Sequence, residues 1–434
     1  MTAVRSCAGR RAARTARSAA AVMAVMAVMA AVAGCGSADQ AEPAALARQG
    51  PPIPPEVPDG RDAATPVAAG AWRVLPVSPA GPLLGPVLAW DGREVLQVGG
   101  VTGQVRQPDG AIVDRPPRTD SVAFSPADHR WRRLDPAPFP VAADHAVSVW
   151  TGRALIVLTA HGAAALTPSS GRWHPIAAPP IDILDGVSAV RSAGRVVLAV
   201  TPPAVQPVRT QVAVYDPDTD RWRRADPPVI PGHDPMDSPL VATADGVVLF
   251  SLWSHSTSQT VKGATVVGVQ AGVDIMRLTP ETRWTTVASD WPQQETVSSP
   301  LLTDAGIIVA AGQIWCGACS HPAPFNEHGY LADTHTLHGR PMPHGPLDDT
   351  DPQIVWTGHA LIALPRAEIG GPDGVLITSG DLAVWNPATD HWTRAARSPV
   401  RLDYRITPVW AGHQLFALDA TGHPLAFVPA VPKT

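Results

Sequence analysis

The chain has 434 residues, of which 48 are proline and 36 are glycine; 16% are charged, and the formal net charge is −5. That much proline excludes a helical bundle, because each proline inside a helix costs roughly 3 kcal/mol. An apolar fraction of 45% with a small net charge also excludes a chain that is disordered throughout. The composition therefore predicts a β-rich globular protein with many turns.

The N-terminal segment changes from basic to apolar to small residues. Residues 1–18 carry five arginines and no acid, and Ala19–Ala33 is an apolar run that is short for a membrane span. It ends in Val32-Ala33-Gly34-Cys35, which resembles the lipobox of bacterial lipoproteins. The resemblance implies a signal peptide over residues 1–34, cleavage before Cys35 and lipid attachment to the Cys35 sulfur. An ordinary secretory signal and twin-arginine export are the alternatives.

Residues 35–70 are rich in alanine and proline and show no apolar periodicity, which predicts an extended tether behind the lipidated cysteine. Removal of five arginines with the signal peptide (33 less 5) leaves 28 basic against 38 acidic residues. This balance gives no electrostatic reason to expect a nucleic-acid partner. We therefore expect a protein held on the extracytoplasmic side of the cell membrane by a lipid anchor.

A short apolar hairpin recurs throughout the rest of the chain. Val149-Trp150-Thr151-Gly152-Arg153-Ala154-Leu155-Ile156 is nearly repeated by Val355-Trp356-Thr357-Gly358-His359-Ala360-Leu361-Ile362. The glycine suits a tight turn that requires a positive φ. Seven such turn glycines are Gly92, Gly152, Gly194, Gly246, Gly306, Gly358 and Gly412.

A second pattern joins a strand, a proline-containing turn and a tryptophan. It is clearest in Tyr215-Asp216-Pro217-Asp218-Thr219-Asp220-Arg221-Trp222 and in Trp385-Asn386-Pro387-Ala388-Thr389-Asp390-His391-Trp392. Asp-Pro and Asn-Pro favour the turn, and the tryptophan is expected on an outer strand. Six tryptophans are placed in this outer-strand position: Trp72, Trp131, Trp173, Trp222, Trp284 and Trp392.

Four short strands recurring about every 50 residues are typical of kelch repeats. Residues 71–434 thus resemble a kelch-type β-propeller, similar to the central domain of galactose oxidase. We predict an all-β, seven-bladed kelch-like propeller, closed by pairing of the N-terminal strand at Trp72 with the last blade near Phe427. A six-bladed or open arrangement is the alternative. The fifth unit departs from the pattern, since Leu331-Ala332-Asp333-Thr334-His335 stands where a tryptophan is expected.

One face of such a propeller should carry the long polar connections, which are predicted as loops over 101–120, 251–273, 311–330 and 365–380 within blades and 226–238, 341–353 and 396–408 between them. Loops on rigid scaffolds commonly bind ligands, although most polar loop residues are simply solvated. The candidate binding residues are His233, Asp234, Asp237, His344, Asp348, Asp349, Asp351, Asp403 and Arg405.

Trp315-Cys316-Gly317-Ala318-Cys319 is the most distinctive segment, with His321 and His328 behind it. With Cys7 cleaved and Cys35 lipidated, Cys316 and Cys319 are the two remaining cysteines, and an exported chain favours a disulfide between them. Alternatively, Cys316, Cys319, His321 and His328 form a zinc or copper site. A thioredoxin-like redox role is a third interpretation, which Pro322 and Pro324 oppose because they prevent a helix.

No nucleophile elbow, phosphate loop or dinucleotide fingerprint is present in the sequence. A galactose-oxidase-like copper radical site is disfavoured, because the chain has three tyrosines, Tyr215, Tyr330 and Tyr404, and Tyr215 belongs to a repeat turn. We therefore expect a binding module for a protein or glycan partner in the cell envelope, without a required cofactor. The alternative is a hydrolase, lyase or oxidase acting on a sugar or cell-wall fragment, with acid–base groups among His233, Asp234, Asp237 and Asp403.

Overall fold

A computed structural model describes residues 70–107, 112–183, 187–202, 208–261, 264–287, 297–311, 329–345, 352–364, 366–369, 376–378, 382–403 and 405–429. These residues belong to one compact unit of the chain. Within these ranges the single helical element is a short 3₁₀ helix, η1 (Ala143–His145). In this part of the chain no helix is long and apolar enough to cross a membrane. The predicted signal peptide, Cys35 and the tether lie outside it.

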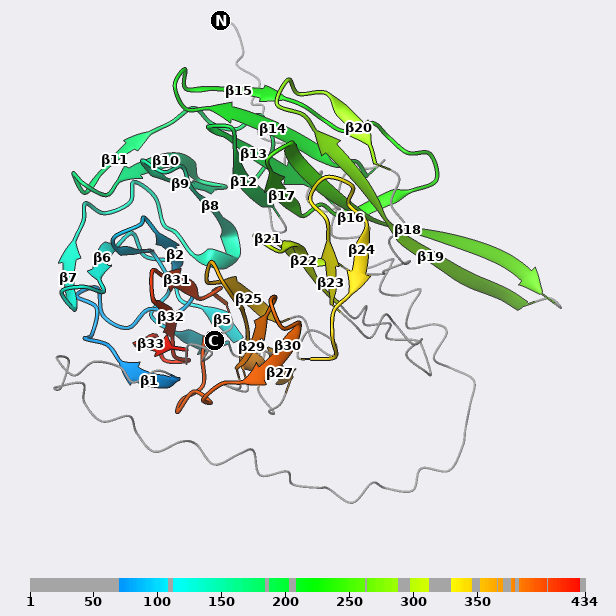
Figure 1. The fold of residues 1–434 in the computed structure, drawn as a ribbon. Coiled ribbons are helices and arrows are strands. Elements are labelled where there is room, and N and C mark those ends of the chain that lie inside the picture. Colours follow the sequence, from blue (N-terminus) through cyan, green and yellow to red (C-terminus); the bar gives the residue numbers. More distant parts are fainter. Residues whose placement is uncertain are drawn as a thin grey trace, which may run out of the picture. The chain divides into compact units, whose positions relative to one another are not determined.

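Seven antiparallel sheets form the blades of a β-propeller (Figure 1), which confirms the predicted all-β, seven-bladed fold. Blades 1 to 3 consist of β2 (Val87–Trp90), β3 (Val95–Val98), β6 (Ser121–Ser125) and β7 (Arg130–Arg133); β8 (Ala146–Trp150), β9 (Leu155–Thr159), β10 (Gly162–Thr167) and β11 (Arg172–Pro175); and β12 (Ser188–Ser192), β13 (Arg195–Val200), β14 (Gln211–Asp216) and β15 (Arg221–Arg224).

Blades 4 to 7 complete the ring, and blade 4 has an additional strand, β16 (Asp234–Asp237), paired with β18. They consist of β17 (Leu240–Thr243), β18 (Gly246–Val261), β19 (Ala264–Leu278) and β20 (Trp284–Thr286); β21 (Val297–Thr303), β22 (Gly306–Ala311), β23 (Tyr330–Ala332) and β24 (Gly339–Pro341); β25 (Gln353–Trp356), β26 (Leu361–Leu364), β29 (Ala383–Asn386) and β30 (His391–Arg394); and β31 (Val409–Ala411), β32 (Gln414–Leu418), β33 (Pro424–Val428) and β1 (Ala71–Val74).

The first strands of the blades contact one another in a closed cycle, from β2 through β8, β12, β17, β21, β25 and β31 back to β2. These strands are therefore the innermost ones. The last blade takes its outer strand from the start of the propeller, since β1 pairs with β33 and places Trp72 opposite Phe427. The predicted closure is confirmed, and it leaves no unpaired edge between the two ends of the ring.

The hydrophobic core lies between the blades. It divides into seven clusters of buried residues, one at each junction of neighbouring blades. Alternate residues of a strand point to opposite faces of its sheet. On β3, accordingly, Leu96 packs toward blade 2 and Val95 toward blade 7. Each blade is thus held by apolar contacts on both faces.

The turn chemistry matches the sequence pattern. All seven predicted turn glycines have a positive φ, from 72° at Gly412 to 137° at Gly306. The structure adds a second series: the residue two positions before each outer-strand tryptophan is also left-handed, as at Asp220 and Asp390. Gly70, two positions before Trp72, is left-handed in the same way, with a φ of 76°. The closing strand therefore has the local conformation of a continuous blade.

Each outer-strand tryptophan also joins its blade to the preceding one. Its indole N–H donates a hydrogen bond to a backbone carbonyl just after the outer strand of that blade. The six bonds are Trp72 to Ala396 (2.9 Å), Trp131 to Pro76 (2.7 Å), Trp173 to Asp135 (3.0 Å), Trp222 to Ala177 (2.7 Å), Trp284 to Ala225 (2.6 Å) and Trp392 to Pro343 (3.2 Å). Blade 5 also has four strands. It differs from the other blades at Gly339, which occupies the position of the outer-strand tryptophan.

The residue after the tryptophan position often reaches forward to the next blade. Arg73 contacts the His129 ring (2.7 Å), Arg132 donates to the Pro168 carbonyl (2.8 Å), and Arg340 donates to Asp390 (3.0 Å). In blade 4 this position is Thr285, and its cross-strand neighbour Arg277 supplies the guanidinium instead. Neighbouring blades are thus joined by polar as well as apolar contacts.

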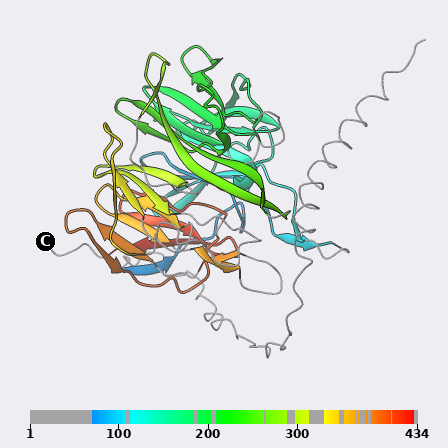
Figure 2. The same cartoon turned by 90° about the vertical axis from the view of Figure 1, so that its right-hand side faces the viewer.

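The antiparallel order gives the propeller two distinct faces. The turn face carries the turns from first to second and from third to outer strand, and the loop face carries the other connections. Two predicted loops contain paired strands: β4 (Gln104–Arg106) with β5 (Ile112–Asp114), and β27 (Arg366–Ile369) with β28 (Leu376–Thr378). The prediction of a loop over 251–273 is wrong, because β18 and β19 continue through this segment as a long hairpin (Figures 1 and 2).

Candidate functional site

The predicted binding residues are distributed over the loop face. Asp348, Asp349 and Asp351 lie outside the described residues, as do Cys316, Cys319, His321 and His328. His344 is exposed in the connection from blade 5 to blade 6. The other predicted residues fall into two separate groups, one around His233 and one around Arg405.

His233 stacks on Trp253 of β18, with ring centroids 3.8 Å apart and an interplanar angle of 13°. Trp253 pairs with Gly272 of β19, where a Cβ atom would lie 2.7 Å from the indole ring. Gly272 therefore leaves room for the indole against the strand backbone. His233 Nδ1 also lies 2.7 Å from the Asp274 carboxylate. Because these residues come from two segments, the connection between blades 3 and 4 is fixed to the base of the long hairpin.

The sequence grouped His233 with Asp234 or Asp237, and the structure places a further carboxylate, that of Asp274, against the His233 ring. Asp234 and Asp237 lie on β16 and pair with Ser254 and Leu252 of β18. Asp237 accepts the backbone N–H of Ser238 at 2.7 Å. Its side chain is exposed, and desolvation by neighbouring protein atoms raises the pKa of its carboxyl. The carboxylate beside His233 is Asp274, which sequence reasoning missed because it lies 41 residues away.

A pocket of about 300 Å³ lies beside the His233–Trp253 stack, between blades 3 and 4 on the loop face. Arg209 lies shortly before β14, Gln211 is the first residue of that strand, and both side chains line this pocket. Val229 is 59% exposed on its rim, and Met236 of the same connection is 52% exposed. Arg224 is held by Asp226 at 2.7 Å. Further lining residues are Val208, Thr210, Pro227, Pro228, Ile230, Pro235, Ser251, Asp274 and Met276.

The second group surrounds Arg405, in the connection that leads into β31. Asp403 accepts hydrogen bonds from the Gly85 N–H (2.7 Å) and from Arg405 Nε (3.1 Å). The same guanidinium reaches Asp114 of β5 at 3.2 Å. Asp403 and Arg405 are almost fully buried, with side chains 2% and 6% exposed. Their hydrogen bonds fix the loops of blades 7 and 1 together, which is a structural role.

Asp144 lies near Arg405 and was not singled out by the sequence. It belongs to η1, directly before the innermost strand of blade 2, and its side chain is exposed. Desolvation raises its pKa, and the nearby Arg405 charge opposes the shift in part. Asp144 and Asp237 therefore both place a carboxyl with a raised pKa at the loop-face end of the innermost strands.

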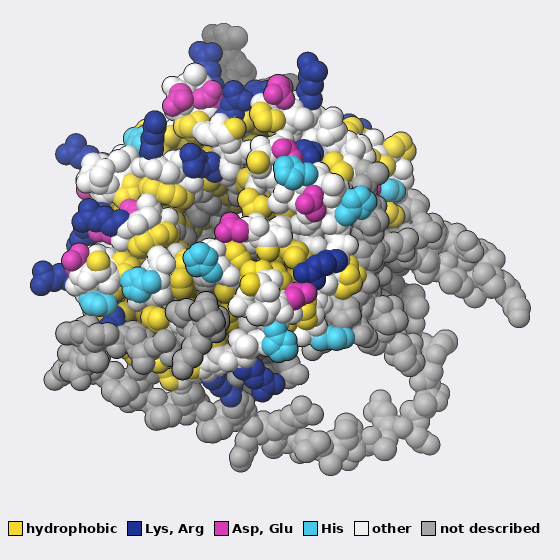
Figure 3. Space-filling model, viewed as in Figure 1, with side chains coloured by type: hydrophobic (Ala, Val, Ile, Leu, Met, Phe, Trp, Pro, Cys, Tyr) yellow, Lys and Arg dark blue, Asp and Glu magenta, His cyan; other side chains and the backbone are white. Residues whose placement is uncertain are grey.

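The turn face holds a larger hollow of about 820 Å³, and several of its charged groups stabilise the fold. Glu94 accepts two hydrogen bonds from Arg132, at 2.9 and 2.6 Å, and these bonds hold the Glu94 pKa below its usual value. Asp91 caps its own turn by accepting the N–H of Arg93. In the view of Figure 3, acidic, basic and histidine side chains are interspersed with apolar ones, without a patch of one sign.

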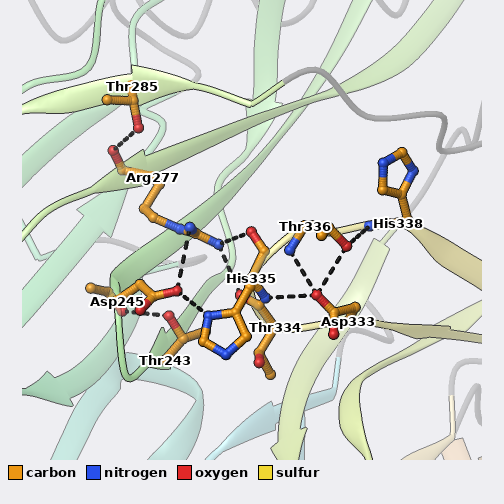
Figure 4. Close-up of polar contacts among 10 residues, drawn as sticks. Thr243, Asp245, Arg277, Thr285, Asp333, Thr334, His335, Thr336 and His338 are labelled. Carbon is orange, nitrogen blue, oxygen red and sulfur yellow. Dashed lines mark hydrogen bonds and ion pairs between the residues drawn. The ribbon is translucent and has the colours of Figure 1, made fainter.

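A further turn-face cluster joins blades 4 and 5 (Figure 4). Arg277 donates to the carbonyls of Thr334 (2.8 Å) and His335 (2.9 Å), and His335 Nδ1 lies 2.5 Å from Asp245. His338 lies apart from the His335 ring in the same view. This arrangement links two blades and does not gather histidines around one point.

The described residues do not supply a metal site. No group of three His, Cys, Asp or Glu side chains in this part of the chain is arranged to hold a metal ion. Tyr215 donates its hydroxyl to Asp220, and Tyr330 is buried in the core between blades 4 and 5. Tyr404 and the Cys316–His328 segment lie outside the described ranges. The described residues therefore do not fit a copper centre that needs tyrosine ligands.

No protein-family model matches the chain, and no curated protein matches its sequence. Among solved structures, the fold is similar to a fungal alcohol oxidase of the AA5 family solved in complex with copper. The TM-score is 0.52 with 11% sequence identity, over 84% of this chain and 76% of that one. At this identity the similarity supports the propeller fold alone.

Proposed function

We propose that this protein is a kelch-type propeller lipoprotein, anchored through Cys35 on the extracytoplasmic side of the cell membrane, whose loop face binds a protein or glycan partner in the cell envelope. The proposal rests on the pocket between blades 3 and 4, which Arg209 and Gln211 line beside the His233–Trp253 stack. The tether over residues 35–70 would hold this face away from the membrane.

The chemistry of the pocket supports a polar ligand. Its walls combine proline and aliphatic groups with several hydrogen-bond donors and acceptors, among them Arg209, Gln211 and Ser251. Arg209 can donate several hydrogen bonds in a fixed plane. The exposed Val229 on the rim adds apolar contact area beside these groups.

Site-specific crosslinking in intact cells tests the proposal. A photoreactive residue at Arg209 should capture an envelope protein or glycan, and the same residue at Arg153, in a turn on the opposite face, should not. With the captured partner in hand, Arg209→Ala should weaken its binding by about tenfold or more, as expected for loss of a charge-assisted hydrogen bond. Arg153→Ala should have no effect. Equal capture from both faces would contradict the proposal.

An oxidase is the second candidate, because a solved neighbour of the same fold is a copper-containing alcohol oxidase. Asp144 and Asp237 would be its acid–base candidates, and the Cys316, Cys319, His321 and His328 segment its candidate site for copper or zinc. The test is oxygen consumption by copper-loaded protein with a primary alcohol. Activity that is lost in both Asp144→Asn and Asp237→Asn would favour this candidate over a pure binding module.

A further inference from the structure

The long hairpin of blade 4 extends well beyond the sheet to which it belongs. β18 and β19 pair continuously from Val247–Leu278 to Val261–Ala264. The neighbouring strands cover the base of this hairpin: β16 reaches Ser254 of β18, and β20 pairs only with residues 276–278 of β19. Among the described residues the outer part of the hairpin is therefore a two-stranded ribbon, and at about 3.3 Å per residue Ala264–Val273 spans roughly 30 Å.

The free edge of β19 can be assigned from one hydrogen bond. The backbone N–H of Val287 donates to the Ile275 carbonyl at 3.0 Å, so the Ile275 backbone groups point away from β18. Backbone groups alternate in direction along a strand. The same edge therefore carries the backbone N–H and C=O groups of every second residue: Val273, Ala271, Val269, Val267 and Thr265. None of these backbone groups is paired with a strand that the structure describes.

This edge lacks the usual protection against strand pairing. Ala264–Val273 contains no charged residue and no proline. Natural edge strands are usually interrupted by charges, prolines or bulges that prevent another strand from adding. An isolated two-stranded ribbon is also only marginally stable in water. As far as the described strands are concerned, the outer part of the hairpin therefore offers an open backbone ladder and would be stabilised by another strand.

We propose that the partner strand is β19 of a second copy of this chain, added antiparallel about a two-fold axis to give a four-stranded sheet. In such an isologous contact residue i meets j while j meets i. The residues whose backbone groups point to the free edge are two positions apart. If the two-fold axis passes through Val269, Val267 of one copy pairs with Ala271 of the other, and Thr265 pairs with Val273. Because the strand is uncharged, this pairing brings no like charges together.

In Figure 1 the hairpin projects beyond the other sheets of the propeller. Self-association goes beyond the proposed function, since it uses the edge of β19 and not the pocket at Arg209. Loss of dimerisation with retained Arg209-dependent binding would separate the two.

Sedimentation velocity of the full-length protein tests the proposal. The protein should dimerise at or below about 100 μM. Val269→Pro removes an outward N–H while leaving the β18–β19 ladder intact, and should weaken dimerisation by at least about tenfold, because the loss occurs twice in a symmetric pair. Ser256→Pro is the matched control. Ser256 pairs with Val269, so its own backbone groups point to the opposite edge of the ribbon, and its dimer should persist.

Charge substitutions give a second measurement in case a proline disturbs the hairpin. Val269→Lys and Val269→Glu should each be monomeric, and an equimolar mixture should recover the dimer through opposite charges. A monomeric wild-type protein, a dimer insensitive to Val269→Pro, or loss of the dimer in Ser256→Pro alone would overturn the proposal. Pairing of the edge with a different protein while the chain stays monomeric would also overturn it.

Discussion

Trp72 lies 5.2 Å from Phe427, measured between ring centroids, although the two residues are near opposite ends of the propeller sequence. Trp72 also donates its indole N–H to the Ala396 carbonyl of blade 6. One side chain thus contributes to the closing sheet and to the junction with the preceding blade.

Replacement of Trp72 should consequently destabilise the closed ring. Trp72→Ala removes both the aromatic packing and the hydrogen bond, and should lower the free energy of unfolding by about 3 kcal/mol. Trp72→Phe keeps most of the packing and should lose only about 1 kcal/mol with the N–H. Urea denaturation of both variants measures the difference. Equal losses would show that the ring packing contributes little to closure.

The ring was predictable because its signals are local and repeated. The glycines required for positive φ, such as Gly152 and Gly358, and the tryptophans of the outer strands are each determined by a short stretch of sequence. The outer part of β18 was missed because Ser254–Thr260 is continuously polar and lacks the alternation that marks a half-buried strand. Its pairing depends on a ladder continued from the core.

The site was harder to predict than the fold, since its contacts join distant segments. His233 is adjacent to Asp274 and Trp253, and Arg405 to Asp114, only because different blades and loops meet. The sequence identified His233, Asp403 and Arg405 by residue type. It carried no signal for the buried, bonded state of Asp403, which follows from the approach of Gly85.

Gly272 should be required for the geometry of the His233 site. In Gly272→Ala the new methyl group would lie 2.7 Å from the Trp253 ring and displace it from the strand. His233 should then lose its stacking partner. The expected result is a red-shifted tryptophan emission, with a small loss of stability. Gly162→Ala is the control, because the three atoms nearest to its added carbon, the first at 2.7 Å, all belong to the Phe139 ring and none to a tryptophan. An unchanged emission spectrum in Gly272→Ala would contradict the stacked arrangement.

The raised pKa of Asp237 predicts a pH-dependent effect on stability. Desolvation favours the protonated carboxyl in the folded state, so ionisation reduces stability as pH rises above the unfolded-state value of about 3.9. Asp237→Asn keeps the acceptor for Ser238 without the charge, and should therefore be more stable than wild type at pH 7. The gain should vanish below about pH 3.9. Thermal denaturation across this range measures it, and a gain that is constant with pH would indicate another cause.

Arg277 should contribute more to stability than Arg340, although both link neighbouring blades. The Arg277 side chain is 15% exposed and donates to two carbonyls, whereas Arg340 and its partner Asp390 are 50% and 41% exposed. Arg277→Met should cost about 2 kcal/mol, since hydrogen bonds to a charged donor are lost and the carbonyls become unsatisfied. Arg340→Met should cost less than about 1 kcal/mol, because water screens an exposed pair. Urea denaturation at low and at high salt tests both expectations, since the Arg340 contribution should decrease with salt. Equal costs would mean that the junction between blades 4 and 5 does not depend on the Arg277 contacts.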